Sequence, residues 1–214
     1  MAPYQSHGFI GQQINDWIKA IKRTHRELFE LAENLNSDCY KSLGNVKIDN
    51  SSLRQTLISC LFARCLELFQ ASYILVAHGM SPSANIMLRV LIEAMFVLCA
   101  TAKDDHALEA YMNDGERERL RITKKLLADK DSSLPKERLK ALEENKKELN
   151  EIMKKEKVRK FSTEDYARKA GLHRWYLTAY TKTSWAVHTT IRDMERYLVL
   201  DEEENIKSIR FIPT

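Results

Sequence analysis

The stretch PSANIMLRVLIEAMFVLCATA, residues 82–102, decides the fold. Its apolar side chains cover nearly every face of an ideal helix, which is typical of a helix at the centre of a protein. Its first residue is proline, which is favoured at the start of a helix because the N–H that it lacks would be unpaired there anyway. The sequence therefore predicts a central, buried helix over residues 82–102.

Three polar residues interrupt this helix along one line. Asn85, Arg89 and Glu93 are four residues apart and therefore share one face. An unpaired buried guanidinium or carboxylate is strongly unfavourable, so these groups need partners. One interpretation is a structural Arg89–Glu93 ion pair that fixes the helix register, and the other is a cleft lined by a fixed cation and a tuned carboxylate. Both charges argue against a membrane span, which would rarely accept them near its middle.

The rest of the chain is also predicted to be helical. Only six glycines and four prolines interrupt 214 residues, which favours long helices over a strand-rich fold. We expect an all-α antiparallel bundle of five to seven helices, forming a single domain over residues 1–214. The other helices are expected at residues 11–36, 53–78, 104–130, 135–160, a short segment that ends at Gly171, and 173–200, with a loop at 37–50.

Residues 104–160 stand out because Lys and Glu dominate both of their helices. A thin apolar stripe on a charged helix suits one packing partner rather than a deep core. We therefore expect a charged helical hairpin, formed by the fourth and fifth helices, outside the bundle or projecting from it. Interleaved acids favour a solvated face over a nucleic-acid surface. Residues 201–214 are expected to form an acidic stop followed by an extended tail.

Composition limits the remaining classes. The net charge is +4, which permits contact with nucleic acid without requiring it. The four cysteines form no CxxC pair, so we expect no zinc or redox site, no other metal and no cofactor. Free thiols in apolar helices favour a reducing compartment, and no secretory signal is recognisable, so the expected location is the cytoplasm.

A second polar line lies on the last predicted helix. Tyr180, Ser184, His188 and Arg192 are again four residues apart. Facing polar stripes can meet in one pocket of a helical bundle. His188 is either a general base or a core histidine that donates one N–H to a neighbour.

If the two stripes meet, their residues suit a catalytic or ligand-binding site. His188 would be the acid or base, Ser184 would orient it, Arg89 would bind an anion and Glu93 would pair with either. The remaining members would contact the ligand: Asn85, Tyr180 and Arg192.

The run Leu88-Arg89-Val90-Leu91-Ile92-Glu93, followed by Tyr180, Ser184 and His188, resembles a prokaryotic family of unknown function, DUF5677, over residues 55–195. That family is similar in build to the helical HEPN nucleases, which pair as dimers and cut RNA without metal through an Arg-x(4–6)-His motif. The resemblance thus implies a helical homo-oligomer. Arg168 and His173 have this spacing, with Gly171 between them as a predicted helix stop, whereas His188 has no arginine at the required distance upstream.

Two functions remain open at this point. One is a binding or regulatory module, linked to phage defence or mobile elements, that grips RNA or a small anion. The alternative is a HEPN-like, metal-independent endoribonuclease in which His188 acts with Arg89. No membrane partner is expected for either function.

Overall fold

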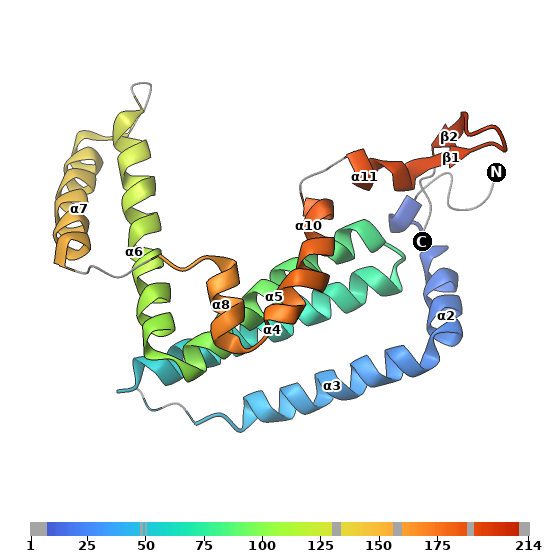
Figure 1. Cartoon of the computed structure of the whole chain (residues 1–214), viewed down its shortest axis with the longest axis horizontal. Helices are drawn as coiled ribbons and strands as arrows, with labels where there is room; N and C mark the ends of the chain where they lie inside the picture. The colour runs from blue at the N-terminus through green and yellow to red at the C-terminus, as the bar shows by residue number, and fades with distance from the viewer. Residues whose placement is uncertain are drawn as a thin grey trace.

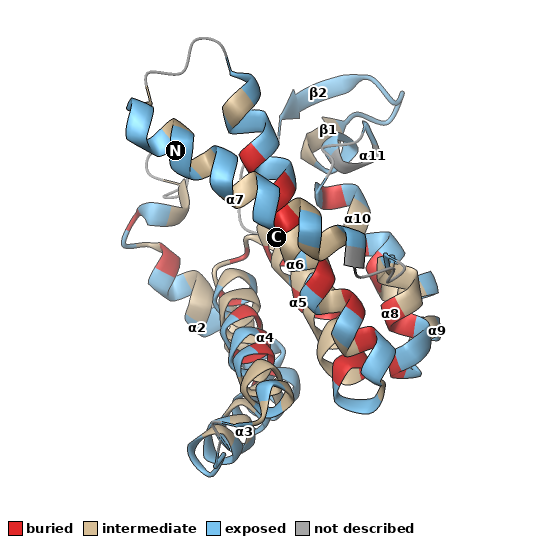
Figure 2. Cartoon of the chain, turned by 90° about the vertical axis from the view of Figure 1, so that its left-hand side faces the viewer, coloured by how far each residue is buried: buried red, intermediate tan, exposed pale blue. Residues whose placement is uncertain are grey.

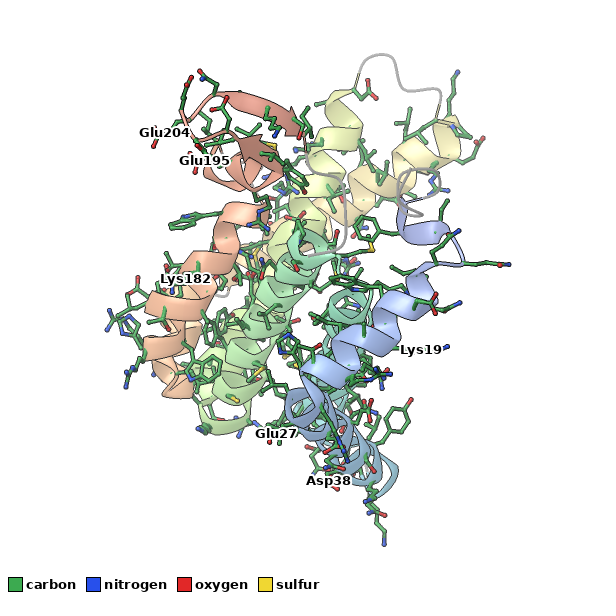
Figure 3. The ribbon with its side chains drawn as sticks, turned by 90° about the vertical axis from the view of Figure 1, so that its right-hand side faces the viewer. Lys19, Glu27, Asp38, Lys182, Glu195 and Glu204 are labelled. Atoms are coloured by element: carbon green, nitrogen blue, oxygen red, sulfur yellow. The ribbon has the colours of Figure 1, made fainter. Side chains whose placement is uncertain are left out.

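The structure is a computed structural model that describes residues 8–47, 49, 51–129, 134–155, 160–187 and 191–209, without the side chains of residues 155, 192 and 193. In this part of the chain the elements are helical apart from one small two-stranded sheet, so the predicted all-α class is confirmed. Figure 1 shows three layers, with α2 and α3 on one side of the α4–α5 pair and α8 to α10 on the other. Figure 3 shows the same order from the side, with Lys19 on α2 and Lys182 on α10 at opposite edges.

The first layer departs from its predicted form. A 3₁₀ turn, η1 (Gly8–Ile10), precedes α2 (Ile14–Thr24) and α3 (Arg26–Gly44). The predicted helix over residues 11–36 is therefore wrong in two respects: it breaks at His25, where φ is −114° and ψ is 37°, and it continues through most of the predicted loop. Thr24 and His25 are weak helix formers, whereas nothing before Gly44 stops the second helix.

The middle layer follows the local signals closely. Helix α4 (Leu53–Ala77) begins at Ser52, whose hydroxyl accepts a hydrogen bond from the Gln55 N–H at 3.3 Å. It ends before Gly79, which has a φ of 69°. Helix α5 (Ser81–Lys103) then returns antiparallel to α4, with Pro82 in its first turn. Both helices are long and apolar enough to cross a membrane, a property that they share with core helices of soluble proteins.

A charged helical pair stands at one end of α4 and α5 (Figure 1). Helix α6 (Asp105–Ala128) begins at Asp104, whose carboxylate accepts a hydrogen bond from the Ala107 N–H at 2.8 Å. Helix α7 (Lys136–Lys155) packs against α6 and buries Leu149. Five basic residues of the pair bind acids three residues before them on the same helix, so these ion pairs lie along its surface: Arg117, Arg119, Arg121, Lys146 and Lys154.

The third layer begins with α8 (Thr163–Ala170), which a reciprocal Ser162–Asp165 capping box starts and left-handed Gly171 (φ 76°) ends. The predicted helix over residues 173–200 is wrong as a single element. The described parts of this region are α9 (His173–Trp175), the π-helical turn η2 (Tyr176–Tyr180), α10 (Thr181–Val187), α11 (Ile191–Met194) and the 3₁₀ turn η3 (Glu195–Tyr197).

A β-hairpin closes the described chain. Strand β1 (Leu198–Leu200) pairs antiparallel with β2 (Ile206–Ile209). The Asp201 carboxylate accepts backbone N–H groups of Glu203 and Asn205 at 3.0 and 2.8 Å, which closes the turn. The predicted acidic stop is thus a turn, and the predicted tail is extended at 206–209. Because the first and last predicted helices are both divided, the described helices exceed the predicted five to seven.

The core centres on α5, as Figure 2 shows by the buried positions along it and its neighbours. Phe96, Ala100 and Tyr166 are at most 5% exposed and belong to one apolar cluster that joins α5, α6, α8 and η2. A second cluster joins α5 to α4 through Cys65, Leu68 and Leu91. Helix α5 therefore has the central place that its sequence predicts.

Candidate functional site

Arg89 on α5 joins two layers of the protein. Its Nη1 donates to Glu93 Oε2 at 2.8 Å, one helical turn away. Its Nε donates to Ser184 Oγ at 3.0 Å, and its Nη2 donates to the Tyr180 hydroxyl. The guanidinium also lies over the Tyr180 ring, with Cζ 4.3 Å from the centroid. The structure thus brings together residues of both predicted polar lines, and the Arg89 side chain is only 17% exposed.

Glu93 connects this group to the start of α8. Its Oε1 accepts a hydrogen bond from the Thr163 hydroxyl at 3.2 Å, while Oε2 binds Arg89. The Glu93 side chain remains 40% exposed, so the carboxylate is fixed on two sides and open on a third. We call Arg89, Glu93, Thr163, Tyr180 and Ser184 the Arg89 cluster.

A π-helical turn presents Tyr180 to Arg89. The wider turn of η2 leaves the Tyr176 carbonyl to accept from the Thr181 hydroxyl at 2.9 Å. Tyr176 stacks on Tyr180 at 5.1 Å between ring centroids, and Ser184 donates back to the Tyr180 carbonyl at 2.8 Å. These contacts fix both residues that hold Arg89 from the third layer.

A cavity opens beside Glu93, between α5, α6 and the start of α8. Its volume is about 760 Å³, within the usual range for small-molecule sites. We call it the Glu93 cavity, and its wall contains three acids, three aromatic rings and one lysine: Glu93, Asp114, Asp165, Tyr111, Phe161, Tyr166 and Lys160. Within the described part of the chain, no group of three or more His, Cys, Asp or Glu side chains is placed to hold a metal.

Tyr166 is the least expected member of this wall. It is 5% exposed, and its hydroxyl has no hydrogen-bond partner among the described residues. Burial, with the nearby charge of Asp114, raises the pKa of Tyr166, so the phenol stays protonated at neutral pH. A buried unpaired hydroxyl is unfavourable unless a ligand or water satisfies it. The sequence signal for this position is the capping box at Ser162, which starts α8 and so sets the face that Tyr166 occupies.

The model of a family of unknown function, DUF5677, matches residues 55–206. The chain belongs to this family. The match includes most of α4 and all of α5, α8, η2 and α10, and therefore all five residues of the Arg89 cluster. Neither the search of curated proteins nor the search of solved structures found a match for the chain.

Of the remaining predicted site residues of this DUF5677 protein, Asn85 is described and lies away from the Arg89 cluster. Asn85 lines a different hollow of about 510 Å³, between α5, α4 and the first layer, beside Leu88 and Phe29. His188 and the side chain of Arg192 lie outside the described residues, so their predicted roles stay predictions.

Arg168 and His173, which have the HEPN-like spacing, meet on one carboxylate. Arg168 Nη2 donates to Glu164 Oε1 at 2.6 Å, and His173 Nε2 lies 3.0 Å from the same oxygen. These hydrogen bonds, first from Arg168 and then from His173, hold the pKa of Glu164 below its usual value. Gly171, predicted as a helix stop, is the left-handed residue that turns His173 back toward α8. The His173 ring also stacks on Tyr176, which in turn stacks on Tyr180 of the Arg89 cluster.

Proposed function

We propose that this DUF5677 protein is a small-molecule binding module whose ligand occupies the Glu93 cavity. One observation carries the proposal: the Glu93 carboxylate is fixed by Arg89 and Thr163 yet stays 40% exposed at a cavity of about 760 Å³. A fixed acceptor at the edge of a cavity is already oriented for a ligand, which reduces the ordering that binding requires. The Arg89 cluster then acts as the support of the cavity wall.

This proposal changes the ligand expected from the sequence. A small anion or RNA phosphate would need the positive charge of Arg89. That charge is matched by Glu93, and one N–H of each guanidinium nitrogen is already donated within the protein. The Arg89 cluster therefore supports a structural role for the ion pair, with Glu93 as the member that also faces the cavity.

A screen of thermal stability tests the proposal. Amines, carboxylic acids, sugars and nucleosides would each be added to the wild type, to Val97→Trp and to Val76→Trp. Val97 lines the Glu93 cavity, whereas Val76 lines the other hollow, so the two variants make the same change in two places. We expect a ligand that raises the Tm of the wild type and of Val76→Trp by several degrees, since binding only to the folded state stabilises it.

The same ligand should leave the Tm of Val97→Trp unchanged. Circular dichroism of the unliganded variants shows whether each one folds, and Asp114→Asn serves as a milder second variant of the cavity. The proposal is wrong if no compound shifts the wild type, or if every shift persists in folded Val97→Trp.

RNA cleavage is a second candidate, which the meeting of Arg168 and His173 on Glu164 favours. A histidine beside an arginine combines a proton-transfer group with a cation that stabilises phosphate charge. The test is cleavage of labelled RNA without metal by the wild type and by His173→Ala, with exposed His106→Ala as the matched control. Loss of cleavage in His173→Ala alone supports this candidate, and a wild type without cleavage contradicts it.

The predicted pair of His188 with Arg89 is tested in the same assay. His188→Ala separates it from the Arg168 pair, because that variant leaves Glu164 and its partners intact. Cleavage lost in His188→Ala and kept in His173→Ala would favour the pairing with Arg89. A link to phage defence or mobile elements stays a prediction, which the neighbouring genes would test.

We also propose that the protein forms a homo-oligomer. Leu28 and Leu31 on α3 are 67% and 66% exposed, beside the apolar hollow of the first layer. Association would remove this surface from water. Light scattering of the wild type and Leu31→Glu tests the proposal, which a wild-type monomer at micromolar concentration would contradict.

A further inference from the structure

The acids of the Glu93 cavity set the sign of the charge that it favours. Arg89 and Arg117 pair with Glu93 and Asp114 at 2.8 Å, but neither arginine lines the cavity. Among the described lining residues, Lys160 is the one cation opposite three carboxylates. Ionised carboxylates only accept hydrogen bonds, so the wall calls for a ligand that donates them.

The aromatic members of the wall favour the same sign. The Tyr166 ring lies between Phe161 and Tyr111, at 5.3 and 6.4 Å between centroids. The faces of aromatic rings carry partial negative charge and attract cations more strongly where water is displaced. A ring that turns its face to the cavity would add to the preference for a cation that the acids set.

The unpaired Tyr166 hydroxyl is a third and separate observation. Tyr166 is 5% exposed and is itself one of the residues that line the cavity. A phenol oxygen can accept a hydrogen bond while its own proton is donated. Because this oxygen has almost no accessible surface, a ligand N–H would reach it only after a small movement of the cavity wall.

We infer that the Glu93 cavity takes a small organic cation, a protonated amine attached to an apolar or aromatic body. The inference rests on the proposed function and adds the chemical class of its ligand. The ammonium group would donate to Glu93 and Asp114, and the apolar body would lie against Val97 and Phe161. The cavity volume admits a body of one or two rings.

Three probes of similar size and different charge test the inference by calorimetry: phenethylamine, 2-phenylethanol and phenylacetate. We expect phenethylamine to bind the wild type at least about tenfold more tightly than 2-phenylethanol, and phenylacetate to bind more weakly still. Raising the salt concentration should weaken the binding of phenethylamine and leave the binding of 2-phenylethanol unchanged.

Matched variants on α6 locate the charge that matters. Asp114→Asn keeps a hydrogen-bond acceptor for Arg117 and removes one negative charge from the cavity. We expect the affinity for phenethylamine to fall about tenfold and the affinity for 2-phenylethanol to change little. Glu118→Gln makes the same kind of change one turn further along α6, outside the cavity wall, and should bind all three probes as the wild type does.

The outcomes separate the inference from the proposed function. If phenylacetate or 2-phenylethanol binds as tightly as the amine and Val97→Trp abolishes that binding, the binding module stands and the cationic ligand is overturned. If none of the three probes binds, the compounds found in the thermal-stability screen decide the outcome. Amines whose binding Asp114→Asn weakens support the inference, and compounds of any other class overturn it. A screen without any compound sensitive to Val97→Trp rejects both.

Discussion

Arg89 on α5 and Arg121 on α6 each bind a glutamate about one helical turn away, yet they do different things for the protein. Arg121 is 55% exposed, and its partner Glu118 is 51% exposed on the same helix. Arg89 is 17% exposed, and it also reaches Ser184 and Tyr180, more than ninety residues further along the chain. The difference shows that an ion pair matters for architecture when it connects separate elements, and contributes little when it stays on one exposed helix.

The largest expected effect is that of Arg89→Ala. The substitution leaves Glu93, Ser184 and Tyr180 without their shared donor in a partly buried place, where unmatched polar groups are unfavourable. Because Glu93 is 40% exposed, we discount the buried-pair value and expect a loss of about 2 kcal/mol in the free energy of unfolding. Urea denaturation measures the loss, which in Tm would be roughly 4–8 °C. A loss as small as that of a surface arginine would contradict the distinction between the two regions.

A smaller effect is expected for Tyr180→Phe. The change keeps the ring that lies under Arg89 and against Phe96, and removes only the hydroxyl that accepts from the guanidinium. We expect the free energy of unfolding to fall by about 1 kcal/mol, which is the usual contribution of one hydrogen bond. Tyr176→Phe is the matched control on the same π-helical turn, and it should change the Tm less. Equal losses in the two variants would show that the hydrogen bond from Arg89 to the Tyr180 hydroxyl adds no stability of its own.

Glu164, at the junction of α8 and α9, should contribute less to stability than Arg89 and more than Arg121. Its contribution should depend on pH. Because the pKa of Glu164 is lowered in the folded protein, its contribution to stability is present above the unfolded pKa of about 4.3 and is lost as the pH falls through the folded value. We expect Glu164→Gln to lower the Tm at pH 7 by less than about 2 °C, and this difference to shrink as the pH falls below about 4.3. A difference that stays constant from pH 7 to pH 3 would mean that the carboxylate charge is not its cause.

Local signals account for the parts of the fold that the sequence predicts correctly. Ser52, Asp104, Gly79 and Gly171 start or end helices through bonds to neighbouring residues or through a left-handed backbone, and all four are readable in sequence. The hairpin of β1 and β2 is not readable in this way. Its strands are stabilised by pairing with each other, and the short apolar run Leu198–Leu200 fits a helix end equally well.

Because the sequence shows only neighbours along one helix, the four-residue spacing identifies some residues of the site and misses others. A step of four residues advances an α-helix by 400°, so every step turns the side chain by about 40°. Arg89 and Glu93 are one step apart and stay together, whereas Asn85 is two steps from Glu93 and faces another hollow. Thr163, Asp114 and Tyr166 come from other elements, and only the packing of α8 against α5 and α6 brings them to the Glu93 cavity.

The smallest expected effect is that of Arg121→Ala, which measures the other side of the comparison. Both partners of the ion pair are more than half exposed, so solvent and salt screen their attraction and water replaces each lost contact. We expect the free energy of unfolding to change by no more than the error of the urea measurement, and any change to disappear in 1 M salt. Leu149→Ala on α7 is the control for lost packing between α6 and α7. Leu149 is 2% exposed, so its truncation should lower the free energy of unfolding by roughly 2–4 kcal/mol. If the loss in Arg121→Ala approached that of Leu149→Ala, the exposed ion pairs of α6 would be as important to folding as the buried packing between α6 and α7. The contrast between Arg121 and Arg89 would then fail.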